Sequence, residues 1–183
     1  MAINFLEQLV AEWYEYQGYF IRRNVRVGKR RAGGWECELD VVAFHPQTKH
    51  LVHVEPSTDA GSWDERERRY KKKFEAGRKY IPGMFPGLLP PDTVPEQIAL
   101  FVITSRNESR SLAGGRVVHV SAFLEPIITQ FAAVSMLKGQ VPEQFTILRT
   151  LQFVTEYQKE LFKQQPNRTI ERDARKSGAR PSL

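Results

Sequence analysis

Two short segments early in the chain alternate apolar and polar residues and predict a β-hairpin. Residues 36–44 and 50–57 each read as a strand, and residues 45–49 between them form a proline-containing turn. Because successive side chains point to opposite faces of a strand, the hairpin allows Asp40 and Glu55 to converge. We expect these two carboxylates to meet while their apolar neighbours face a core: Leu39, Val41, Val52 and Val54.

Helical spacing of apolar residues and short apolar runs predict the remaining elements. We expect helices over residues 3–17, 62–80, 121–138 and 141–165, and further strands over residues 19–27, 98–104 and 116–120. Pro and Gly interrupt residues 82–92, but the apolar residues there need cover, so we expect an ordered loop packed over the core. This order of elements predicts an α/β fold with a mixed central sheet of about five strands flanked by helices.

The chain divides into three parts on this pattern. Its 183 residues fit one domain with an appendage. We expect an α/β core over residues 1–138 and a C-terminal helix packed on that core over residues 139–166. Residues 167–183 are mostly polar and basic, and we expect them to form a basic flexible tail.

The apolar stripe of the first expected helix decides which of its acidic residues can reach the sheet. On a helical wheel of about 100° per residue, Glu7 flanks the stripe, whereas Glu12 and Glu15 point toward solvent. Glu7 is therefore the helix acid expected nearest a site between helix and sheet. Cys37 lies on the opposite face of its strand from Asp40 by simple alternation, and we interpret it as a core residue.

The net charge of +6 is not spread evenly along the chain. The expected helix over residues 62–80 carries eight basic residues against four acidic ones. Localised positive charge suits a polyanion such as nucleic acid. The same residues equally fit a solvated helix with ion pairs between residues four apart, for example Glu67 with Lys71.

Several protein classes do not fit the sequence. No run approaches the roughly 18–20 apolar residues that span a bilayer, and the N-terminus opens into an expected helix rather than a signal peptide. The single cysteine excludes an internal disulfide, so we expect a cytoplasmic protein with no membrane contact. The four histidines lack zinc-ligand spacing, and no Gly-x-Ser-x-Gly elbow indicates a serine hydrolase.

Two carboxylates on adjacent apolar strands repel each other and lose hydration, so they require compensation. A hard divalent cation is the usual solution, because Mg²⁺ takes oxygen ligands and binds a couple of carboxylates together with substrate phosphate. Metal-assisted phosphodiester hydrolysis is therefore the leading hypothesis for Asp40 and Glu55. His53 shares a strand face with Glu55, where it could be a third ligand, a proton carrier or simply a hydrogen-bonded side chain.

Three segments in this order carry a resemblance to a known family. They are Phe5-Leu6-Glu7, Glu38-Leu39-Asp40-Val41-Val42-Ala43 and Leu51-Val52-His53-Val54-Glu55. Over roughly residues 5 to 120 the chain resembles the PD-(D/E)XK superfamily of restriction-endonuclease-like nucleases. The family core is a helix, a three-stranded meander, a helix and a further strand, with a helix glutamate, an aspartate on the second strand and Glu-x-Lys on the third.

The resemblance implies a function for each matching residue. It implies that Asp40 and Glu55 bind Mg²⁺ or Mn²⁺ with the backbone carbonyl of Pro56, and that Glu7 supports the site through water or metal. It also implies a nuclease-like core over residues 1–138, DNA as the substrate, and a homodimer as one form in which such enzymes cut both strands.

The family lysine would fall at Ser57, and a serine cannot replace an ammonium. On the helical wheel of residues 62–80, Lys73 lies on the near flank of the buried stripe, so we predict that it supplies the missing lysine. Pro56 lacks an N–H, so we expect the strand ladder to end or bulge at Glu55. The expected phosphate contacts are Arg66, Lys71, Lys29, Arg30 and Arg31.

Two functional hypotheses follow from the missing strand lysine. In the first, the protein is a metal-dependent endonuclease that hydrolyses DNA, with Glu7, Asp40, Glu55 and Lys73 as the catalytic set. In the second, the site is degraded, and the fold binds nucleic acid or a protein partner without cutting. A third possibility of a different class is an assembly protein whose basic helix meets an acidic partner.

Overall fold

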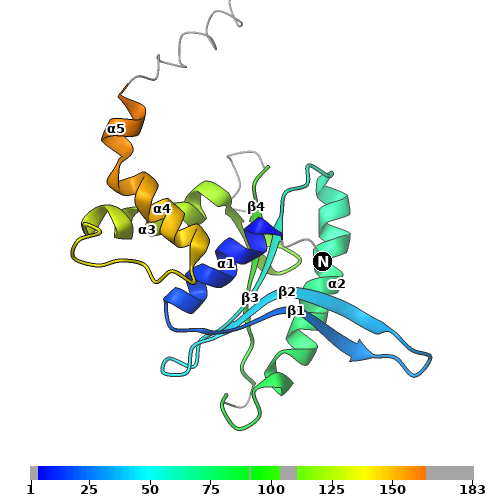
Figure 1. The fold of residues 1–183 in the computed structure, drawn as a ribbon. Helices are drawn as coiled ribbons and strands as arrows, with labels where there is room; N and C mark the ends of the chain where they lie inside the picture. Colours follow the sequence, from blue (N-terminus) through cyan, green and yellow to red (C-terminus); the bar gives the residue numbers. More distant parts are fainter. Residues whose placement is uncertain (1–3, 91, 104–110, 164–183) are drawn as a thin grey trace, which may run out of the picture.

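The computed structural model of this chain describes residues 4–90, 92–103 and 111–163. These residues form one mixed sheet with helices on both faces (Figure 1). The strands are β1 (Phe20–Lys29), β2 (Trp35–Phe44), β3 (Leu51–Ser57), β4 (Glu96–Phe101), β5 (Ser111–Leu112) and β6 (Gly115–His119). The helices are α1 (Phe5–Tyr16), α2 (Trp63–Tyr80), the 3₁₀ turn η1 (Pro82–Met84), α3 (Val120–Ala133), α4 (Thr146–Glu156) and α5 (Gln158–Phe162).

The predicted α/β class and mixed sheet are confirmed, with six strands instead of five. The strand order is β1-β2-β3-β4-β6-β5. The first three strands form an antiparallel meander, α2 then crosses over to β4, and β4 runs parallel to both β3 and β6. The strand absent from the prediction is β5, whose two residues pair with β6 and are too short to give a periodic signal.

Helices cover both faces of the sheet, which explains the continuous apolar run of β4. Ile98 and Leu100 pack in the cluster beneath α1, α3 and α4, whereas Ala99 and Phe101 pack beneath α2. All four are nearly inaccessible to solvent. The strand predicted over residues 98–104 is confirmed, although it begins at Glu96 and ends at Phe101.

The crossover helix α2 begins and packs as its sequence predicts. Ser62 and Glu65 form a reciprocal capping box at its N-terminus. Tyr70, Phe74 and Gly77 are buried at spacings of four and three residues, which places one continuous stripe against the sheet. The loop after α2 is also ordered as predicted, because the ring of Phe85 packs 4.8 Å from that of Phe44.

The sheet changes face at the position of Asp40, which simple alternation does not predict. Leu39 and Val41 are two residues apart, yet Leu39 packs on the α2 side and Val41 packs on the α1 side. The register pairs Arg23 with Val41 and Val25 with Leu39, so Asn24 of β1 lies opposite Asp40. Asn24 has a φ of +53°, a left-handed conformation that turns the strand locally.

The prediction that Glu12 points toward solvent is wrong. Its side chain is only 5% exposed, and its Oε2 atom accepts the backbone N–H groups of Ile147 at 2.8 Å and Leu148 at 3.0 Å. These N–H groups belong to the first turn of α4, where no carbonyl of that helix can accept them. Glu12 therefore caps a helix more than 130 residues away, a contact that no local pattern reveals.

The single helix predicted over residues 141–165 is two shorter helices. Helix α4 begins only at Thr146, and the chain leaves helical geometry at Tyr157 before α5. Helix α3 also ends earlier than expected, at Ala133. Within these helices Leu148 is buried, whereas Phe153, Val154, Tyr157 and Leu161 are exposed, so only part of the expected C-terminal helix packs on the core. The tail predicted over residues 167–183 lies outside the described residues.

Among the described helices, none combines the length and the apolar composition required to cross a bilayer.

Candidate active site

The site is built where β2 separates from β3. Pairing between these strands ends at Val41 and Val54, one residue before Asp40 and Glu55. The backbone N–H of Asp40 instead donates to the Oε1 atom of Glu55 at 3.2 Å, so a carboxylate takes the place of a ladder acceptor. The ladder therefore ends near Glu55 on the β2 side, as predicted, whereas on the β4 side it continues through Pro56, which pairs with Leu100.

Lys73 of α2 joins the two predicted acids. Its ammonium donates to the Oδ1 atom of Asp40 at 2.7 Å and to the Oε2 atom of Glu55. The predicted convergence of the three side chains is confirmed as geometry. Glu55 is 1% exposed and Asp40 is 18% exposed, so a lysine from the opposite layer neutralises two largely buried carboxylates.

The electrostatics of this trio keep Lys73 protonated and disfavour ionisation of Asp40 beside Glu55. Burial raises the pKa of Asp40 to about 7, with further contributions from the hydrogen bond and negative charge of Glu55. Burial also acts to lower the pKa of Lys73, but the charges of Glu55 and Asp40 outweigh it, and the net shift is upward. Lys73 therefore remains an ammonium beside the acids.

The predicted accessory acid Glu7 lies near the trio without contacting it. Burial and the negative charge of Asp40 raise the pKa of Glu7, so it is close enough for the two charges to interact. Its Oε1 atom accepts a hydrogen bond from Asn4 at 2.8 Å, which holds the carboxyl at the start of α1. This placement fits action through a water molecule rather than direct contact.

A chain of hydrogen bonds behind Glu55 fixes its carboxylate. Fully buried His53 donates from Nε2 to Glu55 Oε1 at 2.7 Å, and its Nδ1 atom accepts from Gln97 at 3.1 Å. Gln97 in turn accepts from Arg78 at 2.6 Å. Burial lowers the pKa of His53 to about 3, so the ring is neutral. Both ring nitrogens are engaged, which favours the hydrogen-bonded interpretation of His53 over a ligand role.

Gly77 makes room for this chain of hydrogen bonds, which gives a prediction for stability. A Cβ atom at Gly77 would lie 2.4 Å from His53 Nδ1 and 2.8 Å from Gln97 Nε2. Helix propensity alone would make Gly77→Ala stabilising by about 1 kcal/mol. We expect the opposite, a loss of roughly 2–3 kcal/mol in the free energy of unfolding measured with urea, because overpacking displaces a buried polar pair.

Gly83→Ala is the matched control, because no atom lies within 4 Å of a Cβ at Gly83. Equal or higher stability of Gly77→Ala relative to this control would contradict the packing argument.

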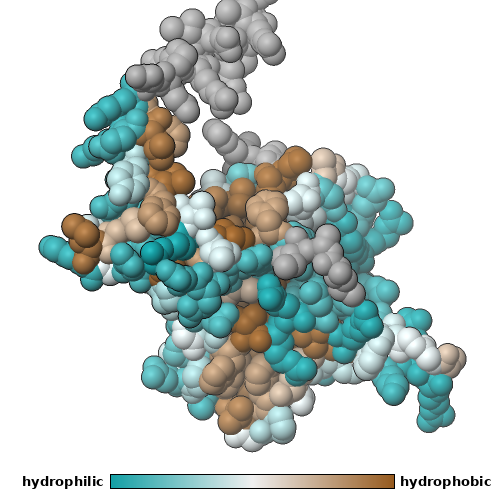
Figure 2. Space-filling model, viewed as in Figure 1, coloured by the Kyte–Doolittle hydropathy of each residue, from teal (hydrophilic) through white to brown (hydrophobic). Residues whose placement is uncertain are grey.

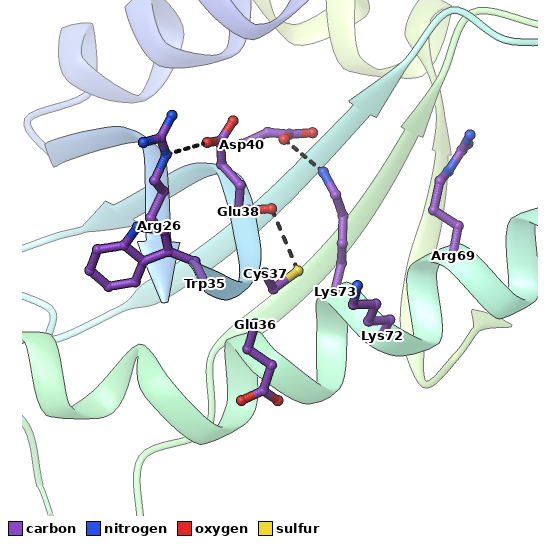
Figure 3. A pocket seen from close by; sticks show the side chains of 9 residues that line it. All are labelled: Arg26, Trp35, Glu36, Cys37, Glu38, Asp40, Arg69, Lys72 and Lys73. Atoms are coloured by element: carbon purple, nitrogen blue, oxygen red, sulfur yellow. Dashed lines mark hydrogen bonds and ion pairs between the residues drawn. The ribbon is translucent and has the colours of Figure 1, made fainter. Parts of the chain in front are cut away.

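An open pocket of about 530 Å³ lies between the β1–β2 hairpin and α2 (Figure 3). Trp35 and Arg26 line it from the hairpin together with three acidic residues, whereas Arg69, Lys72 and Lys73 line it from α2, so its positive charge lies mainly on the helix wall. The full set of lining residues is Arg26, Trp35, Glu36, Cys37, Glu38, Asp40, Arg69, Lys72 and Lys73.

The interpretation of Cys37 as a core residue on the face away from Asp40 is wrong. Cys37 is half-buried, packs on the α2 side and lines the pocket together with Asp40. The change of face at Asp40 explains the difference, because it breaks the alternation on which the prediction depended. Burial raises the pKa of its thiol, so Cys37 is not poised as a nucleophile.

The predicted phosphate contacts are placed differently from one another. Arg66 is 5% exposed, and its guanidinium donates to the carbonyls of Asp59 and Ile103, both at 2.8 Å, so it braces loops inside the protein and does not face the pocket. Lys71 is exposed but does not line the pocket. Arg69 and Lys72 do line it, because Arg69 lies three residues before Lys72 and four before Lys73, which places these side chains next to one another on α2. The exposed tip of the hairpin carries Lys29, Arg30 and Arg31.

The donors present fit a hard cation. In the described part of the chain, no group of three or more His, Cys, Asp or Glu side chains converges as a metal site. The oxygens that do meet belong to Asp40 and Glu55, and the Pro56 carbonyl follows directly in β3. Two carboxylates, a carbonyl and water form an oxygen set that suits Mg²⁺ or Mn²⁺ once the Lys73 ammonium moves aside.

No protein-family model matches the chain, and no curated protein matches its sequence.

Proposed function

We propose that this protein is a Mg²⁺- or Mn²⁺-dependent endonuclease that hydrolyses phosphodiester bonds in DNA on a restriction-endonuclease-like core. The observation that carries the proposal is that the Lys73 ammonium contacts both Asp40 and Glu55 where β2 separates from β3. The order of α1, the β1–β3 meander, α2 and β4 also agrees with that core. The acid–acid–lysine set is then complete, with its lysine on α2 instead of at Ser57.

The proposed roles follow from the placement of each group. Asp40, Glu55 and the Pro56 carbonyl hold the ion, which when bound supplies an activated water and neutralises charge on the scissile phosphate. Lys73 moves off the carboxylates, orients the attacking water and stabilises the negative charge that develops on phosphate oxygens. Glu7 acts through water, because it lies near Asp40 without touching it.

Residues behind the site supply rigidity in this proposal. His53 and the Asp40 backbone N–H both donate to Glu55 Oε1, which leaves Oε2 as the atom available to Lys73 or an ion. Gln97 holds the tautomer of His53, because its amide donates to Nδ1. A carboxylate fixed in this way loses little conformational freedom when it binds.

One observation favours the second hypothesis, an inactive fold that binds nucleic acid or a protein partner. Lys73 already neutralises both acids, so the protein does not require an ion to satisfy them. In that case DNA binding would be salt-sensitive and independent of metal.

Incubation of plasmid and linear DNA with Mg²⁺, with Mn²⁺ and with a chelator separates the two functions. We expect nicked and linear products with either cation and none with the chelator. Intact DNA under every condition would contradict the nuclease and favour the binding protein. Light scattering of the protein with and without DNA tests whether the active form is a homodimer, which we include in the proposal.

A further inference from the structure

The outer half of the β1–β2 hairpin is an arm that projects from the body of the protein (Figure 1). From Asp40 to Trp35, β2 pairs within the described residues only with β1. Val25 and Val27 hold the base of this arm in the apolar cluster beneath α2. Figure 2 shows that the projecting end is largely hydrophilic.

The tip of the arm carries positive charge that no ion pair among the described residues neutralises. Beyond Asp40 the arm carries four cations, all of them exposed: Arg26, Lys29, Arg30 and Arg31. Arg26 forms an ion pair with Glu38 at 3.0 Å, and the arm residue Glu36 pairs with Lys79 of α2, whereas the other three cations form no ion pair with another described residue. Such a surface is suited to a polyanion, and on α2 Lys72 continues it across the pocket beside Arg69, which pairs with Asp59.

The arm is held in place rather than free to swing. The Arg30 N–H donates to the Gly34 carbonyl at 3.1 Å, and the Gly33 N–H donates to the Arg30 carbonyl at 3.1 Å, so the tip is a closed turn. The Tyr80 hydroxyl donates to Glu36 at 2.5 Å, which ties β2 to the end of α2. The arm therefore loses little conformational entropy when a ligand binds to it.

The dimensions of the arm fit duplex DNA. From Asp40 to the tip at Gly34 the strand spans about 20 Å, at about 3.3 Å per residue. Phosphates on one strand of B-DNA advance about 3.4 Å per base pair, so the tip reaches roughly six base pairs from the site, about half a helical turn. The major groove, about 12 Å wide, admits a two-stranded ribbon, whereas the deep, narrow groove of duplex RNA does not.

We propose that the β1–β2 hairpin enters the major groove of double-stranded DNA and that duplex DNA is the form bound at the site. Lys29, Arg30 and Arg31 contact phosphates beside the groove, while Arg69 and Lys72 hold the backbone against the opposite wall of the pocket. This inference rests on the proposed function, because it assigns the form of that substrate.

The test uses the full chain carrying Asp40→Asn, without metal, so that binding is measured independently of cleavage. Fluorescence anisotropy compares a 20-base-pair DNA duplex with single-stranded DNA and with an RNA duplex of the same length, across a range of salt concentrations. For Arg30→Gln/Arg31→Gln we expect roughly tenfold weaker duplex-DNA binding at 0.15 M salt. We also expect the slope of log K against log salt to fall in magnitude by about 2.

Lys159→Gln/Lys163→Gln is the matched control, since it removes the same charge from exposed positions on and just after α5, at the other end of the molecule (Figure 1). Equal losses of duplex-DNA affinity in the two double variants would overturn the proposed role of the arm. Binding of single-stranded DNA or duplex RNA as tight as that of duplex DNA would overturn groove entry. Groove binding that survives while no cation supports cleavage would refute the nuclease and leave the arm intact.

Discussion

Asp40→Asn is expected to abolish DNA cleavage while making the protein more stable. Loss of a metal-binding carboxylate removes several kcal/mol of transition-state stabilisation, which corresponds to a rate roughly 10³-fold lower. The stability gain follows from the raised pKa of Asp40, because the fold disfavours its charged form beside buried Glu55. The neutral asparagine relieves this repulsion. We expect the free energy of unfolding to rise by about 1 kcal/mol, which corresponds to an increase of about 2–4 °C in Tm.

The stability gain has a defined pH dependence. In the unfolded chain the pKa of Asp40 is near 3.8, whereas in the folded protein burial raises it to about 7. The folded state therefore binds more protons at Asp40 between these values, so the contribution of Asp40 to the stability of metal-free wild-type protein falls as the pH rises from about 4 to 7. Asp40→Asn lacks this loss, so its advantage in thermal unfolding should grow across the same window.

Glu143→Gln is the control for Asp40→Asn, because it removes one negative charge at an exposed position remote from the site. Cleavage by this control should match wild type, and its Tm should not rise with pH relative to wild type. Wild-type cleavage rates in Asp40→Asn would rule out a metal-binding role for Asp40.

The meeting of Asp40, Glu55 and Lys73 could be predicted because each step depends on a local period. Alternation placed the acids on the hairpin, and the 100° wheel placed Lys73 on the flank of α2 that faces the sheet. The structure brings the three groups within hydrogen-bonding distance. Ser57 at the expected lysine position did not obstruct the prediction, because the hydrophobic stripe of α2 fixed its orientation independently.

The differences between the predicted and the observed positions of other residues arise from long-range contacts, which the periodicity of the sequence does not predict. Cys37 was misplaced because a left-handed residue, Asn24, turns the neighbouring strand and changes the face of the sheet. Glu12 was misplaced because its partners lie in α4. Gln97 was missed, although a polar residue at the start of an apolar strand was an available signal. Its contact with His53 could not be predicted, because it requires the parallel register of β3 and β4.

The same long-range packing explains why the set of phosphate contacts needed revision. Arg66 and Lys73 flank the same stripe of α2, yet the loop around Asp59 and the end of β4 enclose Arg66. Its guanidinium lies 4.4 Å from the ring of Phe101 and inside the protein. A helical wheel gives the direction of a side chain but not what covers it, so Lys73 reaches the pocket and Arg66 does not.

Lys73→Met is expected to make the stability of the protein depend on metal. In the ion-free protein Lys73 is the cation that neutralises Asp40 and Glu55, so its removal leaves buried carboxylates without a counter-charge. Breaking such a pair costs about 3–5 kcal/mol, or roughly 10 °C in Tm. Millimolar Mg²⁺ should restore most of this loss in Lys73→Met, because an ion that binds only the folded state stabilises it by mass action.

Wild-type protein should respond less to Mg²⁺, since the ion must first displace the Lys73 ammonium. Cleavage by Lys73→Met should remain roughly 10³-fold below wild type even when Mg²⁺ restores the fold, because the ammonium that stabilises phosphate charge is missing. Lys72→Met is the stability control, as Lys72 is an exposed neighbour on α2. If Lys73→Met has the same Tm as Lys72→Met and Mg²⁺ raises the Tm of neither variant, the buried carboxylate pair is not an ion site.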